Sequence, residues 1–293
     1  NQGVPAEASH VLISNGSKQS IMNAILALVN RDDEVLIPIP AWVSFPEQVK
    51  LADGRPVFVP TSEEEGFKLK ADRVERYITK RTKLLILNNP NNPTGSVVNR
   101  EDLLKIADLM MRHGVYVVCD EIDDHLIFEG EGHASMASLS PEIRKMTITT
   151  NGFSKTYAMT GWRVGYAIAE PEIIKRMTAI QSHYTSGGIH VAQRAALAAL
   201  TESQECVEEM RRIYRERRDY LLKRLANIPG MTCRKPEATF YAYPNVRGLF
   251  GRIRLDSVGS STELANLFLE KVQVGIVPGV AFGTEGYVRI SYA

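Results

Sequence analysis

The chain has 293 residues, of which 44% are hydrophobic, so it is long enough to bury the cores of one large domain and one smaller domain. Its 35 Lys and Arg residues nearly balance 34 Asp and Glu residues, and the net charge of +1 argues against nucleic acid or an anionic membrane as a partner. No apolar run approaches the roughly 20 residues of a membrane span. We therefore expect small molecules as partners.

In chain order, strands and helices alternate as in a mostly parallel sheet covered by helices on both faces. The helix over 100–113 is expected to bury Leu103, Leu104 and Ala107 on one face. The patterns predict a helix over 17–29, a strand over 34–39, a helix over 44–52, strands over 56–59 and 83–88, the helix over 100–113, and strands over 115–119, 145–149 and 164–169.

Beyond about residue 170 the pattern changes to long helices, the last of them over 205–226. From Pro229 onward, strands over 239–243 and 287–292 flank a helix over 262–271, as expected of a small α+β domain. We therefore predict a large domain over 1–226 and a small domain over 227–293.

The three cysteines are an odd number at wide spacings, which favours free thiols in a reducing compartment and predicts a cytoplasmic protein. The N-terminus lacks the basic and apolar blocks of a signal peptide. Because the first residue is Asn1 and not Met, we expect that the sequence begins inside a longer gene product.

The most informative stretch is Gly-Phe-Ser-Lys-Thr-Tyr-Ala-Met-Thr-Gly-Trp-Arg-Val-Gly, residues 152–165. A lysine amine forms a Schiff base with an aldehyde, and a hydroxyl just before it and an arginine eight residues after it can meet one phosphate. The stretch resembles the cofactor-attachment signature of class I aminotransferases, which use pyridoxal 5'-phosphate (PLP). The resemblance implies that Lys155 carries PLP and that Ser154 and Arg163 bind its phosphate. The alternative is a surface loop with an ordinary lysine.

Upstream, the stretch over 88–95 reads Asn-Asn-Pro-Asn-Asn-Pro-Thr-Gly and follows an apolar strand. By itself it predicts only a good turn. It resembles the family's Asn-Pro-Thr-Gly turn, which implies that Asn92 donates to the cofactor's ring oxygen O3′ and contacts the substrate. Asn92-Pro93 is also a candidate for a cis peptide bond.

Asp120 follows the predicted strand over 115–119, so its carboxylate should emerge at the C-terminal edge of the sheet, where open α/β sheets bind ligands. A carboxylate at the pyridine nitrogen keeps the ring protonated, and the protonated ring accepts electrons when the substrate Cα loses its proton. The resemblance gives Asp120 this catalytic role. A turn or helix-capping aspartate is the simpler reading.

Three further pieces complete the expected pocket. Gly16, Ser17 and Lys18 precede or begin the first helix and resemble the family's phosphate loop, although a capping serine is the plainer interpretation. Trp42 stands where the family stacks an aromatic ring on the pyridine, and core packing is its alternative. Arg289 resembles the arginine that binds the substrate α-carboxylate through two parallel hydrogen bonds, against the alternative of an exposed strand residue.

The resemblance runs from about Val11 to Ala293 with the motifs in the family's order, and it is closest to bacterial aspartate-type aminotransferases. It implies PLP fold type I, with a mostly parallel sheet sandwiched by helices in the large domain and a small α+β C-terminal domain. It also implies a PLP-dependent aminotransferase that moves the amino group of an L-amino acid to a 2-oxo acid by a ping-pong mechanism, with a homodimer in the full-length protein. Dicarboxylic, aromatic and small neutral amino acids all stay open as substrates.

Two departures from the family pattern stand out. Asp123 occupies the position where the family usually has a tyrosine that donates to O3′, and a carboxylate there should raise the pKa of the Schiff base unless it is protonated or turned away. The family usually continues beyond both ends of this sequence, so we expect a chain truncated at both ends with an incomplete small domain.

Other functions share these residues. The same pocket supports β-elimination, 1-aminocyclopropane-carboxylate synthesis or PLP-dependent oxidation, and an inactive PLP-binding fragment is a further alternative. The acidic stretch over 120–125 also permits a metal or nucleotidase site, although no Gly-x-x-x-x-Gly-Lys-Ser/Thr loop accompanies it. We expect no metal.

Overall fold

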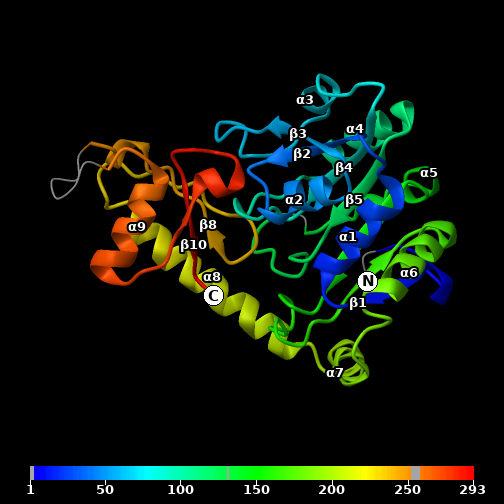
Figure 1. Ribbon diagram of the computed structural model, residues 1–293. Coiled ribbons are helices and arrows are strands. Elements are labelled where there is room, and N and C mark those ends of the chain that lie inside the picture. The colour runs from blue at the N-terminus through cyan, green and yellow to red at the C-terminus, as the bar shows by residue number, and fades with distance from the viewer. Residues whose placement is uncertain (1–2, 131, 252–257) are drawn as a thin grey trace.

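The computed structural model describes residues 3–130, 132–251 and 258–293, and two β-sheets with the helices around them make up this part of the chain (Figure 1). The strands are β1 (Val11–Ser14), β2 (Glu34–Ile39), β3 (Arg55–Pro60), β4 (Thr82–Asn88), β5 (Tyr116–Asp120), β6 (Thr147–Gly152), β7 (Gly165–Ile168), β8 (Tyr241–Ala242), β9 (Val277–Pro278) and β10 (Val288–Ser291). The α-helices are α1 (Ser17–Leu28), α2 (Ser44–Leu51), α3 (Ala71–Glu75), α4 (Arg100–His113), α5 (Pro141–Arg144), α6 (Pro171–Tyr184), α7 (His190–Thr201), α8 (Glu205–Leu225) and α9 (Ser261–Val272).

The larger sheet has seven strands in the order β1-β7-β6-β5-β4-β2-β3. The neighbours from β6 to β3 pair in parallel, and β7 is antiparallel to both β6 and β1. The smaller sheet, β8-β10-β9, is antiparallel throughout. This architecture confirms the predicted fold class.

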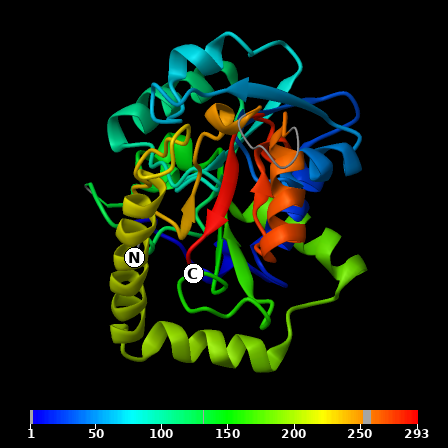
Figure 2. The same ribbon diagram turned by 90° about the vertical axis from the view of Figure 1, so that its left-hand side faces the viewer.

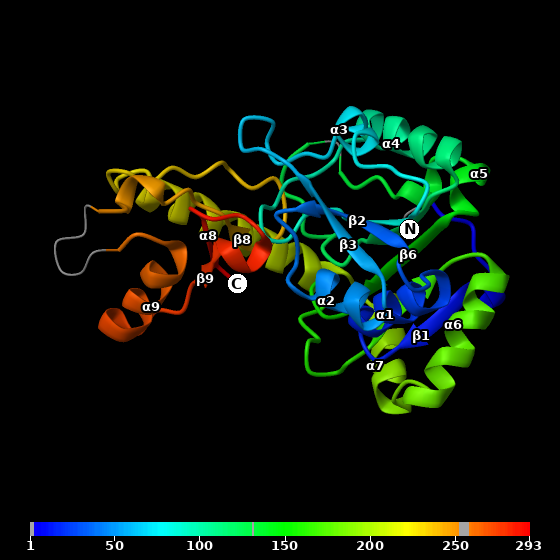
Figure 3. The same ribbon diagram turned by 45° about the horizontal axis from the view of Figure 1, so that its top comes forward.

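Helices cover both faces of the larger sheet (Figure 3), with α3, α4 and α5 on one side and α1, α2 and α6 on the other. Successive residues of the central strands divide between these two layers: Leu84 and Ile86 pack with α1 and α6, whereas Leu85 and Leu87 pack with α4. Because both faces are covered, β4 and β5 contain unbroken apolar runs, which is why sequence pattern located them well.

Most predicted elements recur with bounds shifted by a few residues, and β2 and α4 have the predicted bounds. Asn99 fixes its start by accepting a hydrogen bond from the Asp102 N–H at 2.9 Å, and Gly114 ends it in a left-handed conformation with φ of 66°. The expectation for Leu104 was wrong, because this side chain is 46% exposed. Leu104 lies outside the buried face of α4, which includes Leu103, Ile106, Ala107 and Met110.

The helix α8 is 21 residues long, begins beside α7 and extends to the smaller sheet (Figure 2). Its last turns place Leu221 and Leu225 in the core that the smaller sheet shares with α9. We keep the division between a large domain over 1–226 and a small domain over 227–293 as a proposal. None of the helices in the described ranges is long and apolar enough to cross a membrane.

Arg218 on α8 is 1% exposed and ties three segments together. Its guanidinium donates to Glu129 Oε1 at 3.0 Å, to the Pro236 carbonyl at 2.8 Å and to Asp219 Oδ1 at 2.9 Å. It also lies 5.1 Å from the centre of the Phe128 ring. A buried charge is tolerated only with such partners. Arg218 therefore fixes how α8 packs against the segment that contains Phe128 and Glu129 and against the segment that contains Pro236.

We expect Arg218→Met to lower the free energy of unfolding by about 1 to 3 kcal/mol, because it leaves the buried Pro236 carbonyl without this donor, whereas Glu129 keeps its ion pair with Lys235. Urea denaturation followed by circular dichroism measures the change. The control is Arg212→Ala, since Arg212 is exposed on the same helix and pairs only with Glu209 and Glu216 in the described structure. Equal, small losses in both variants would contradict this role for Arg218.

Candidate functional site

A cavity of about 420 Å³ lies at the C-terminal edge of the larger sheet, where β4, β5 and β6 end side by side. Its lining comes from the larger sheet, the start of α1, the segment after β2 and the smaller sheet. The lining residues are Ser17, Lys18, Trp42, Asn88, Asn92, Asp120, Ile122, Asp123, Ser154, Lys155, Thr160, Arg163, Tyr241 and Arg289.

Every residue predicted for the site lines this cavity except Gly16. Gly16 lies directly behind Arg163, so closely that a Cβ at position 16 would collide with the guanidinium. Its φ of 83° is also one that residues with a side chain rarely adopt. Gly16 therefore acts by letting Arg163 lie against the start of α1.

Positive groups gather at one end of the cavity. Helix α1 begins at Ser17, and the free N–H groups of its first turn attract anions. Arg163 is held there by donating to the carbonyls of Thr160 at 2.8 Å and Asn15 at 3.2 Å. The amine of Lys18 lies 4.7 Å from the centre of the Trp42 ring. This end is suited to a phosphate group.

Two buried carboxyl groups lie elsewhere in the lining. Burial, helped by the neighbouring charges of Asp123 and Glu121, raises the pKa of Asp120 to about 7, against the opposing effects of the Ile122 backbone and Lys155. Burial likewise raises the pKa of Asp123 to about 6, although the charges of Lys155 and Arg289 oppose this shift. Neither oxygen of the Asp123 carboxyl has a hydrogen-bond partner among the described residues. Asp120 is better held, with a 3.5 Å hydrogen bond from Thr150 Oγ1.

Asn88, the last residue of β4, organises the turn that follows it. Its amide donates to the Asp120 carbonyl at 3.1 Å, and its side-chain oxygen accepts from the Asn92 N–H at 2.8 Å. The Asn92-Pro93 bond is cis, as predicted, and Ile39-Pro40 and Asn89-Pro90 are cis as well. Across the cavity, Arg289 Nη1 donates to Asn92 Oδ1 at 2.9 Å, which joins the smaller sheet to this turn.

Sequence reasoning missed four lining residues: Asn88, Ile122, Thr160 and Tyr241. Asn88, Ile122 and Thr160 each lie within or beside a recognised motif, so proximity in sequence was a usable signal. Tyr241 had no such signal, because it reaches the cavity through the pairing of β8 with β10.

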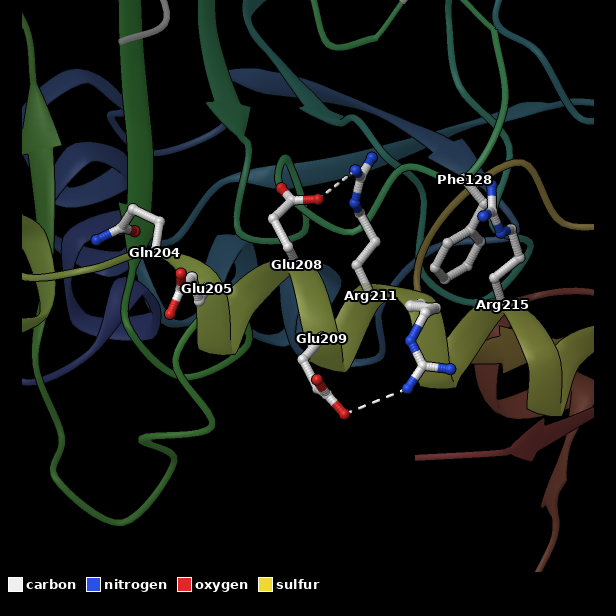
Figure 4. A pocket seen from close by; sticks show the side chains of 8 residues that line it. Phe128, Gln204, Glu205, Glu208, Glu209, Arg211 and Arg215 are labelled. Carbon is white, nitrogen blue, oxygen red and sulfur yellow. Dashed lines mark hydrogen bonds and ion pairs between the residues drawn. The ribbon is translucent and has the colours of Figure 1, made fainter.

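A second hollow, of about 670 Å³, lies along α8 (Figure 4). It is open to solvent, and its charged side chains pair with one another, as in the ion pairs Arg211–Glu208 and Arg212–Glu209. In the described ranges no three His, Cys, Asp or Glu side chains are placed to hold a metal ion, so the metal alternative for residues 120–125 has no geometric support. The chemistry therefore concentrates in the first cavity.

Comparison with known proteins agrees with this arrangement. The family model "Aminotransferase class I and II" matches residues 1–293. The aspartate aminotransferase of Geobacillus stearothermophilus is 42% identical over all of this chain and 74% of its own length, and that of Bacillus subtilis is 39% identical over the same shares.

Solved structures give the same result. The aspartate aminotransferase of Rhizobium meliloti has a TM-score of 0.95 at 35% identity, covering 99% of this chain and 73% of its own. An aromatic aminotransferase from Pyrococcus horikoshii OT3 has a TM-score of 0.92 at 40% identity, covering 99% of this chain and 76% of its own. With a family model across its whole length and relatives near 40% identity, the chain belongs to the class I and II aminotransferase family.

Proposed function

We propose that the chain binds PLP covalently through Lys155 and transfers the amino group of an L-amino acid to a 2-oxo acid in two half-reactions. One observation carries the proposal: a lysine amine, an anion-binding end, buried carboxyl groups and a carboxylate-binding arginine line one cavity of about 420 Å³. Membership of an aminotransferase family implies PLP, and the donor set of this cavity fits that group.

The lining supports a specific orientation for PLP. Arg163, Ser154 and the first turn of α1 would hold the phosphate, since they supply a guanidinium, a hydroxyl and free N–H groups. Asp120 would accept a hydrogen bond from the protonated ring nitrogen and keep it protonated, Asn92 would donate to O3′, and Trp42 would cover one ring face. When bound, PLP supplies an electron sink for the substrate Cα.

The remaining steps fall to the side chains. Arg289 would bind the substrate α-carboxylate, because its planar guanidinium matches two carboxylate oxygens. Lys155, once released, would take the Cα proton as a general base and return a proton as a general acid. Asp123 departs from the family pattern. Its carboxyl has no hydrogen-bond partner among the described residues and lies near Lys155 and Arg289, so it is the group most able to change which reaction the bound cofactor supports.

The names of the relatives indicate which amino acids to test as substrates. Proteins of similar identity are named aspartate aminotransferase, aspartate/prephenate aminotransferase and aromatic aminotransferase. We therefore propose to test acidic, aromatic and small neutral amino acids together. We also propose a cytoplasmic location, in keeping with the free cysteines Cys119, Cys206 and Cys233.

We further propose that the full-length protein is a homodimer that covers α7. This helix buries Ala192 and Ala196 but leaves Leu197 and Leu200 at 50% and 57% exposure. We expect Leu200→Glu to shift sedimentation toward the monomer at equal concentration, whereas Glu202→Gln, an exposed control at the end of α7, should sediment as the wild type. A wild-type protein that sediments only as a monomer, or a dimer unaffected by Leu200→Glu, would exclude this interface.

Purified protein with added PLP should show an absorbance band of the lysine-bound cofactor, which bleaches with a suitable amino acid while an oxo acid accumulates. Lys155→Ala should lose both signals, because it removes the amine that would form the Schiff base. Lys175→Ala, at an exposed position on α6, is the control. A Lys155-dependent band that yields elimination or oxidation products would point to another PLP chemistry, and a band that never changes would point to an inactive binding protein.

The Asp120 and Asp123 carboxyl groups make the stability of the cofactor-free protein depend on pH. Their folded-state pKa values of about 7 and about 6 exceed the ordinary value of 3.8, so the folded state binds these protons more tightly than the unfolded state. Their stabilising effect is complete below the ordinary value and is lost as pH rises through the folded-state values.

We therefore expect Asp123→Asn to raise the free energy of unfolding of the cofactor-free protein at pH 8, by on the order of 1 to 3 kcal/mol, and by less at pH 5. Urea denaturation at the two pH values measures the difference. Asp108→Asn, at an exposed position on α4, should show no such pH dependence. A variant no more stable than the wild type at pH 8 would show that burial of the charged Asp123 carboxylate does not destabilise the fold.

A further inference from the structure

Tyr241 enters the cavity through the register of the smaller sheet. On this sheet Tyr241 pairs with Ser291, so Arg289, two residues earlier on β10, is its diagonal neighbour. Diagonal neighbours on one sheet face lie within reach of an aromatic side chain. The Arg289 guanidinium accordingly lies 4.3 Å from the centre of the Tyr241 ring, a cation–π contact.

The hydroxyl of the same side chain reaches the lysine of the larger sheet. Lys155 Nζ donates to Tyr241 Oη at 3.4 Å, and Tyr241 itself is only 6% exposed. The centre of the Phe240 ring lies 4.8 Å from the same Nζ. The ring of Tyr241 thus contacts the carboxylate-binding arginine while its hydroxyl contacts the amine that moves the proton.

This double contact matters because the two groups act on adjacent atoms of the substrate. The α-carboxylate is bonded to Cα, so Arg289 and Lys155 must be held at a fixed separation for the Cα proton to face the amine. A tyrosine is suited to this, since its side chain has few rotatable bonds. Its hydroxyl accepts from a protonated amine and donates to a neutral one, so the contact survives proton transfer.

We propose that Tyr241 is a positioning residue that sets the separation between Lys155 and Arg289, an inference that rests on the proposed function. The charged groups around the Lys155 amine are Asp120 and Asp123, and Tyr241 supplies the uncharged hydroxyl. Position 123 carries a carboxyl group where the family usually has a phenol. The phenol hydroxyl that contacts this amine comes from Tyr241 instead.

Two variants separate the two contacts. Tyr241→Phe keeps the ring and removes the hydroxyl, so we expect the rate of the first half-reaction to fall about tenfold, with KM for the amino acid within about twofold of wild type. Tyr241→Leu removes both contacts, so KM should also rise about tenfold. Tyr243→Phe is the matched control, because that hydroxyl contacts Thr284 at 2.7 Å outside the cavity lining.

A second readout does not need turnover. The pH titration of the absorbance of bound PLP should shift in Tyr241→Phe and stay unchanged in Tyr243→Phe, and thermal melting should show both variants folded. The inference would be overturned if the absorbance of bound PLP titrated in Tyr241→Phe as it does in the wild type, or if folded Tyr241→Leu had the same KM as the wild type. A wild-type enzyme that transfers no amino group would instead sink the proposed function, while the titration would still decide whether Tyr241 acts on Lys155.

Discussion

The site depends on the common register of three parallel strands. Asn88 at the end of β4 lies opposite Asp120 at the end of β5, which in turn lies opposite Thr150 of β6, two residues before that strand ends. Parallel pairing brings the carboxyl ends of these strands to one edge, so an amide, a carboxylate and the loop that carries Lys155 emerge side by side. The sheet has one apolar layer on each face, and these two layers hold that register. A slip by one residue would turn core side chains away from the layer in which they pack.

The second sheet completes the site from the other side. Arg289 and Tyr241 both come from it, and its position is set by polar contacts to the larger sheet and its loops. Arg289 contacts Asn92, the hydroxyl of Tyr287 donates to Glu63 at 2.9 Å, and Lys68 pairs with Glu237 at 2.8 Å. Arg289, which would meet the substrate carboxylate, therefore comes from the smaller sheet and lies where that sheet contacts the turn after β4.

Local pattern accounts for much of what could be predicted. Strands β4 and β5 contain continuous apolar runs and α4 has strong end signals, so these elements were readable. Leu104 was misjudged because the buried face of a helix is narrower than a simple count of apolar residues suggests. The residues of the cavity were found through short motifs, each of which is a local feature. Tyr241 could not be found in this way, because its strand was predicted but the pairing of that strand with β10, which lies far away in sequence, was not. The ionisation of Asp120 and Asp123 was equally out of reach, since it depends on burial by distant segments.

The lining of the cavity begins at Ser17 and ends at Arg289, almost the full length of the chain. The site therefore forms only when segments from both sheets come together. A molecule that binds there and has no affinity for the unfolded state stabilises the fold by RT ln(1 + L/Kd) at a free concentration L, so the stabilisation grows with the logarithm of its concentration over its dissociation constant. The supply of that molecule inside a cell would then govern how long the protein survives proteolysis as well as whether it can work.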